Sequence, residues 1–71
     1  MKTFVVATNY RRAREVAAKM GVPDGHWWYA ANGRRLRGTP QARVLIEAGA
    51  RIDDEVSALY KIGAISVEIV T

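Results

Sequence analysis

The chain has 71 residues, 49% of them hydrophobic, and its 11 lysines and arginines outnumber 7 acidic residues to give a net charge of +4. The length predicts one domain, residues 1–71, and the hydrophobic share argues against disorder. Because the chain has no cysteine, disulfides, thiolate metal sites and a cysteine nucleophile are excluded. A domain this short buries only about 60% of its unfolded surface, so we expect a homo-oligomer to supply further stability.

The charge is distributed unevenly along the chain. Residues 1–43 carry nine cations and two acidic residues, a net +7, whereas residues 44–71 carry two cations and five acidic residues, a net −3. Such asymmetry favours an acidic partner for the basic half. The alternative is that folding mixes the two halves into a nearly neutral surface.

The first expected elements are a strand and a helix. Thr3–Ala7 is β-branched or apolar at successive positions, which predicts a strand buried on both faces. Asn9–Met20 has apolar residues at helical spacing: Tyr10, Ala13, Val16, Ala17 and Met20. Thr8 or Asn9 is the expected N-cap, and Gly21 ends the helix.

An aromatic strand and a basic segment follow. His26–Ala31 reads HWWYAA and lies between turn residues, which predicts a strand. Within Asn32–Pro40, the pair Asn32-Gly33 is typical of a hairpin turn, with Arg34–Arg37 as the returning strand. Since Leu36 is the only apolar residue of that return, we favour an irregular basic loop.

The second half repeats the plan of strand, helix and strand. Ala42–Gly49 contains a β-branched run and predicts a second buried strand. Asp53 is a suitable N-cap for a helix that ends at Gly63 and has an apolar face of Ile52, Val56, Leu59 and Tyr60. Ile65–Thr71 alternates, so Ile65, Val67 and Ile69 are expected to point inward.

Together these elements predict one small α/β domain in the order β-α-β-loop-β-α-β. The expected sheet has four mostly parallel strands, and two helices complete two or three layers. No apolar run approaches the roughly 18 residues that cross a bilayer, and the N-terminus lacks a signal-peptide pattern. We therefore expect a cytoplasmic protein without a membrane partner.

The residues ATNYRRAREVAAKMG, followed by WWYAANGRRLRG, resemble those of small orphan proteins encoded by actinobacterial phages. The shared features are an opening of the form ATNY..A...A...G, an aromatic strand and an LRG loop, within residues 3–38. The resemblance implies a reduced Rossmann-like or RecA-like α/β core, located in the host cell cytoplasm if the protein is phage-encoded. It implies no settled function.

Arg11, Arg12 and Arg14 lie at the start of the first expected helix, where the macrodipole favours acidic residues. Three explanations are open. The arginines point to solvent at a cost of about 0.3–1 kcal/mol each, or they pair with carboxylates such as Glu15 or Glu47. The third explanation is an external anion, held by the planar guanidinium groups.

Parallel α/β sheets bind ligands beyond the carboxyl ends of their strands. The helix start after the first strand and the basic segment after the second are both expected at that edge. They form one candidate binding patch: Asn9, Arg11, Arg12, Arg34, Arg35 and Arg37. Separate, solvated arginines are the alternative.

Trp27 and Trp28 are adjacent, so in a strand their side chains point to opposite faces. One ring can enter the core, while the other is covered by the helix, lies exposed or joins an interface. An exposed indole next to basic residues also stacks on nucleic-acid bases, so we include Trp28 among the candidate binding residues.

Signals for catalysis or a cofactor are weak. The first helix start has no glycine, so the Walker A and G-x-G-x-x-G phosphate motifs are absent and no cofactor is expected. His26 is the only histidine and does not predict a metal site. The acidic run at Asp53 is explained by a helix start. The three tyrosines are interpreted as packing residues: Tyr10, Tyr29 and Tyr60.

The sequence therefore favours a small non-enzymatic accessory protein that binds a nucleic acid or an acidic host protein through an arginine-rich face. The alternative is a degenerate nucleotide-fold protein that acts through self-assembly. In that case exposed sheet edges and one tryptophan would drive association.

Overall fold

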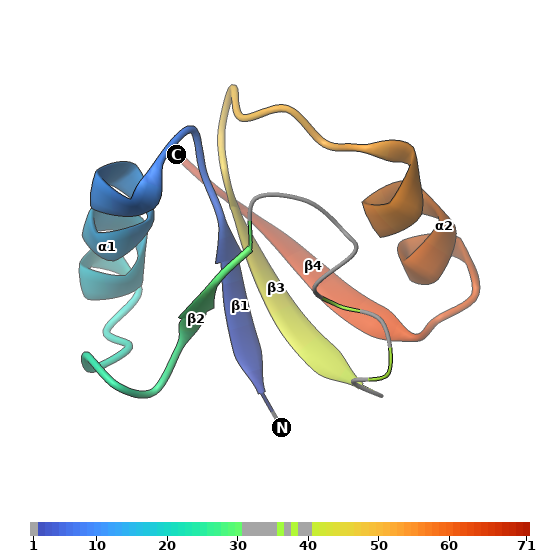
Figure 1. Ribbon diagram of the computed structural model, residues 1–71, viewed down its shortest axis with the longest axis horizontal. Helices are drawn as coiled ribbons and strands as arrows, with labels where there is room; N and C mark the ends of the chain where they lie inside the picture. The colour runs from blue at the N-terminus through green and yellow to red at the C-terminus, as the bar shows by residue number, and fades with distance from the viewer. Residues whose placement is uncertain (1, 31–35, 37, 39–40) are drawn as a thin grey trace.

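The computed structural model describes residues 2–30, 36, 38 and 41–71. Within them the elements are β1 (Thr3–Val6), α1 (Tyr10–Lys19), β2 (Trp28–Tyr29), β3 (Ala42–Glu47), α2 (Asp54–Lys61) and β4 (Ile65–Val70). The four strands form one sheet in the order β2-β1-β3-β4, and every neighbouring pair is parallel. The α/β fold with a parallel sheet is thereby confirmed (Figure 1).

Two strand–helix–strand units extend outward from the centre of the sheet. β1 leads through α1 to β2 on one side, and β3 leads through α2 to β4 on the other. The two helices cover opposite faces of the sheet (Figure 1). The chain therefore changes winding direction between β1 and β3, and in open α/β sheets ligands bind at the carboxyl ends of such a pair.

The central strands carry the core on both faces. Phe4 and Val44 are paired in register and belong to the cluster on the α2 side. Val5 and Leu45 are the next pair and belong to the cluster on the α1 side. All four side chains are almost completely buried, which confirms that both strands are covered from two sides.

Both helices begin with a side-chain N-cap, but the first turns of the two helices differ in charge. The Asn9 side chain accepts a hydrogen bond of 2.9 Å from the backbone N–H of Arg12, so Asn9 is the N-cap of α1. Asp53 accepts a bond of 2.9 Å from the N–H of Val56 and caps α2. The first turn of α2 contains acidic residues, whereas that of α1 contains none. The charge contrast expected from the sequence is confirmed.

The aromatic strand is shorter than the expected His26–Ala31. The N–H of His26 donates to the carbonyl of Pro23 at 3.1 Å, so the preceding turn extends to this residue. The register partners of β1 are Trp28 and Tyr29, and the N–H of Ala30 donates to the carbonyl of Val5 at 3.0 Å. The choice between a hairpin and an irregular loop at Asn32–Pro40 falls on residues that, apart from positions 36 and 38, lie outside the described part of the chain.

The expectation that Ile69 points inward is wrong, because 53% of this residue is exposed. Ile65 and Val67 do pack in the cluster that includes Val56 of α2. The eight-residue helix α2 covers these positions but leaves the end of β4 open. Ile52 and Tyr60, expected on the apolar face, are also largely exposed.

Candidate binding site at the carboxyl edge of the sheet

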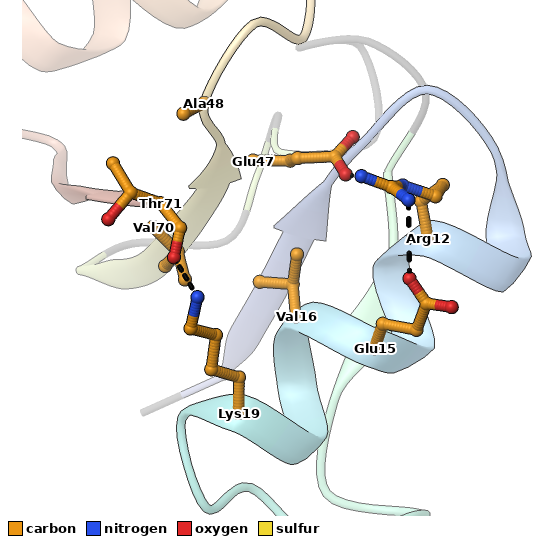
Figure 2. Close-up of a pocket in the computed structure, with 8 residues that line it drawn as sticks. All are labelled: Arg12, Glu15, Val16, Lys19, Glu47, Ala48, Val70 and Thr71. Atoms are coloured by element: carbon orange, nitrogen blue, oxygen red, sulfur yellow. Dashed lines mark hydrogen bonds and ion pairs between the residues drawn. The ribbon is translucent and has the colours of Figure 1, made fainter.

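The carboxylate of Glu47 lies where β1 and β3 end, at the change of winding direction. Glu47 is the last residue of β3 and only 9% exposed. Its Oε1 accepts hydrogen bonds from the backbone N–H of Thr8 at 3.3 Å and from the Thr8 hydroxyl at 3.2 Å. Its Oε2 accepts a bond of 2.7 Å from Nε of Arg12 (Figure 2). The chain thus places its own carboxylate beside the start of α1.

These contacts keep Glu47 in its charged form. The hydrogen bond from Arg12 lowers the pKa of Glu47 below its ordinary value, and the two bonds from Thr8 act in the same direction against the effect of burial. The same contact raises the pKa of Arg12. A carboxylate with a lowered pKa is a weak base, so this arrangement suits a structural ion pair better than proton transfer.

For Arg12, the explanation by pairing with a carboxylate is confirmed. Besides the bond to Glu47, its Nη1 lies 3.5 Å from a carboxylate oxygen of Glu15. Both carboxylates named from the sequence therefore contact this arginine. The basic start of α1 is compensated in part by an acidic residue 35 positions further along the chain.

A cavity of about 180 Å³ lies between α1 and the ends of β3 and β4 (Figure 2). Its charged lining residues balance: Arg12, Glu15, Lys19 and Glu47. The Lys19 ammonium donates to the backbone carbonyl of Thr71. Since these cations already have partners, the cavity does not offer free positive charge to an external anion.

Other exposed residues of α1 lie outside this cavity, and we call Tyr10, Arg11 and Arg14 together the Tyr10 flank. Arg11 makes no ion pair with any described residue. Arg14 lies 3.6 Å from Asp24, but the two side chains are 66% and 73% exposed. An ion pair this exposed contributes little stability and leaves the guanidinium available.

Tyr10 was expected to pack inside, yet it is 60% exposed. Its ring stacks on that of Trp27, with the centroids 5.6 Å apart and an angle of 29° between the planes. The ring of Tyr29 lies nearly perpendicular to the ring of Tyr10, with a centroid distance of 5.9 Å. The ring of Tyr10 is therefore supported by Trp27 on one face and by Tyr29 beside it, while much of its surface remains exposed.

The side chains of Trp27 and Trp28 point to opposite faces of the sheet, as expected for adjacent residues in an extended chain. Trp27 is buried on the α1 side, and Trp28 is 39% exposed. Lys2 Nζ lies 5.2 Å from the Trp28 ring centroid, and Phe4 is its aromatic neighbour at 6.1 Å. Phe4 belongs to the face opposite α1. Trp28 therefore does not join the arginines of α1 in one surface.

The described members of the candidate patch all lie at the start of α1, but their side chains differ in availability. The Asn9 side chain caps α1, Arg12 is paired, and Arg11 is free to bind. The other three members lie outside the described residues, so their convergence with α1 stays a prediction: Arg34, Arg35 and Arg37. Sequence reasoning missed the Thr8–Glu47 contact, although an acidic residue at the end of a buried strand was a visible signal.

No group of histidine, cysteine and acidic side chains suited to a metal ion occurs in the described parts of the chain. Neither α1 nor α2 is long and apolar enough to cross a bilayer. Comparison with protein-family models, with curated proteins and with solved structures gives no match to this chain. The fold and the site geometry are therefore the basis for any functional conclusion.

Proposed function

We propose that the protein is a small, non-enzymatic binding protein that holds single-stranded nucleic acid on the Tyr10 flank. The observation that carries this proposal is the open ring of Tyr10 in the same helical turns as two available arginines: the exposed Arg14, and Arg11, which has no ion pair among the described residues. The same proposal includes phosphate binding by Arg34, Arg35 and Arg37. It also includes an accessory role, of the phage type, in the cytoplasm of a host cell.

Two physical contributions combine at this flank. Aromatic side chains bind unpaired bases by stacking, at about 1–3 kcal/mol per base and with little preference for sequence. Arginines next to the ring bind the phosphates through electrostatic attraction and paired N–H donors. Tyr10 and Arg14 are four residues apart in α1 and therefore lie on the same side of the helix.

An acidic host protein is the weaker candidate for this surface. Acidic side chains would use the guanidinium groups but have no need of an open, supported aromatic ring. Bases use both the ring and the arginines. The net charge of +4 also favours approach to a polyanion.

The test measures binding of labelled single-stranded DNA by fluorescence anisotropy over a range of salt concentrations. The logarithm of affinity falls with the logarithm of salt concentration by about 0.7 per phosphate contact. Replacing two contacting arginines in Arg11→Gln/Arg14→Gln should weaken binding and reduce this slope by about 1.4. Tyr10→Ala should weaken binding by about 1–3 kcal/mol, and Tyr10→Phe should restore most of it.

A matched control removes the same charge elsewhere. Arg51 and Lys61 are exposed and lie on the loop before α2 and in its last turn. Arg51→Gln/Lys61→Gln should keep nearly the full affinity and slope. No binding at low salt, or equal losses in both double variants, would contradict a site on the Tyr10 flank.

Self-association is a second candidate function, favoured by a separate observation. The exposed large apolar residues include Ile52, Tyr60 and Ile69, which α2 and β4 contribute together with the loop before α2. Apolar surface of this kind often marks an interface. A homo-oligomer is therefore proposed alongside nucleic-acid binding, and its oligomeric state is measurable by light scattering.

A further inference from the structure

An apolar groove runs along α2 and the end of β4. Its volume is about 310 Å³, and its lining has no charged side chain among the described residues: Ile46, Ile52, Val56, Ser57, Tyr60, Val67 and Ile69. Ile69 lies in the groove at the open end of β4, while Ile62, 76% exposed, lies between α2 and the start of β4. Apolar surface is thus uncovered near both ends of the same strand.

Within the described part of the chain, β4 is an edge strand with little protection against pairing. It pairs with β3 over all six residues in unbroken register, and no described strand lies on its other side. It contains no proline or bulge, two usual devices that block pairing at an edge, and its one charged side chain is Glu68. β2, at the other edge, has only two residues. Among the described strands, the long free edge of the sheet is therefore that of β4.

The backbone groups available at this edge can be identified. The carbonyl of Val70 accepts from the N–H of Ala48 at 2.8 Å, so Val70 faces β3. Backbone groups of successive residues in a strand point to alternate sides, so Ser66 and Glu68 also face β3. The free N–H and C=O groups are those of Ile65, Val67 and Ile69, whose side chains share the α2 face.

We infer that the free edge of β4 pairs with β4 of a second copy, antiparallel and about a two-fold axis at Val67. This inference rests on the proposed self-association and names its surface. The axis sets Val67 opposite Val67 and Ile65 opposite Ile69 of the other copy, so the free backbone groups of all three residues bond to one another. The result is one continuous sheet of eight strands.

The side chains on this axis are complementary to themselves. On the α2 face, every opposed pair is apolar. On the other face, Ser66 lies opposite Glu68 of the second copy, so no like charges meet. Because the strands are antiparallel, the exposed Ile62 of one copy approaches the open groove at Ile69 of the other. One symmetric contact thereby covers both uncovered ends, as an isologous interface requires.

The charge of the protein gives the dimer a salt dependence of its own. Each copy carries a net +4, so the two copies repel at long range, and added salt should strengthen dimerisation by screening. Salt weakens nucleic-acid binding, which is the opposite response. Failure of one activity is therefore distinguishable from failure of the other.

The experiment measures the dimer dissociation constant of the full chain by sedimentation equilibrium at high salt. Ile69→Lys sets a charge from each copy against the apolar groove and should raise the constant by about tenfold or more. Because Ile69 is exposed in one copy, this variant should keep its circular dichroism spectrum and fold. A dimer constant unchanged by Ile69→Lys overturns the inference and leaves self-association by another surface.

A pair of variants at Ser66 tests the register. Ser66→Glu opposes Glu68 of the second copy and should raise the dissociation constant severalfold, whereas Ser66→Lys should lower it. Within one copy, Glu at position 66 is favoured over Lys, because Ser66 is the register partner of Arg43. Ser66→Glu should therefore stabilise the monomer while it weakens the dimer. If Ser66→Glu and Ser66→Lys changed the dimer dissociation constant equally, Ser66 would not lie opposite Glu68 of the second copy, and the proposed register would be wrong.

Hydrogen exchange gives a direct view of the edge. The amides of Ile65, Val67 and Ile69 should gain protection as protein concentration rises, while those of Ser66 and Glu68 are protected by β3 at every concentration. A chain that stays monomeric at high salt and high concentration overturns both self-association and this interface. In that outcome the edge is left to a strand of a different protein.

Discussion

Glu47 explains why one arginine occupies a helix start where the macrodipole disfavours it. The carboxylate accepts from Arg12 and from both donors of Thr8, and it is nearly buried. Arg12 thus compensates a negative charge supplied by the chain itself. Arg11, one residue earlier, has no such partner among the described residues. Two neighbouring arginines therefore differ in their contacts.

The pKa of Glu47 leads to a pH-dependent stability. A carboxyl group with a lowered pKa in the folded state contributes stability that is present above its unfolded pKa, about 4.3, and is lost as pH falls through the folded value. Glu47→Gln should melt a few degrees below the native protein near neutral pH. This difference should shrink progressively below about pH 4.

Thermal melts followed by circular dichroism from acid to neutral pH measure this difference. Glu68→Gln is the control, because Glu68 is half exposed and its contact with Arg43 is 3.9 Å long. That variant should melt close to the native protein at neutral pH. A difference for Glu47→Gln that stays constant down to strongly acidic pH would contradict the role assigned to the ion pair.

At the scale of the element, the two sides of α1 differ in their contacts. One side carries Arg12 and Lys19, which bind Glu47 and the end of the chain beyond β4 (Figure 2). The other side carries Tyr10 and Arg14, which are four residues apart and exposed. Helix α2, with acidic residues in its first turn and Lys61 in its last, follows the macrodipole rule throughout.

This difference predicts opposite effects of the same substitution at adjacent positions. Arg11→Glu removes an uncompensated cation from the first turn of α1 and should raise the free energy of unfolding by about 0.3–1 kcal/mol. Arg12→Glu places a second carboxylate beside Glu47 and should destabilise the protein. Urea unfolding of both variants measures the two effects. A destabilising Arg11→Glu would show that Arg11 has a structural partner.

At the scale of the whole molecule, the sheet is covered by one helix on each face (Figure 1). The central strands β1 and β3 are closed off on both sides, whereas β4 is an open edge. Stability therefore depends on the centre of the sheet. The surfaces proposed for binding lie at its borders, where a substitution changes recognition more than folding.

Substitutions at the centre and at the edge should differ accordingly. Leu45 is fully buried, so Leu45→Ala should cost about 2–5 kcal/mol. A domain of 71 residues has a total stability of only about 4–11 kcal/mol. Ile69→Ala, at a position that is 53% exposed, should cost well under half as much in the monomer. Urea unfolding at low protein concentration measures both, and equal losses would contradict this division.

Local physics allowed much of the fold to be predicted from the sequence. Helical spacing, the N-caps and the glycines after each helix are short-range features, and they placed α1 and α2 within a residue or two. The alternation of strands and helices likewise predicted the parallel sheet. The bounds of β2 were not predicted well. The aromatic run predicted a strand from His26, but the turn that begins at Pro23 includes His26, and the strand begins at Trp28.

The sequence by itself determined the order of the elements, the ends of the helices and the unusual charge of α1. Only the tertiary structure decided which arginine is neutralised, which aromatic ring is open and which isoleucine of β4 is uncovered. These outcomes depend on the order of strands in the sheet, which brings Thr8 to Glu47 across 39 positions. Contacts of that range follow from how whole elements pack, and no short window of residues contains them.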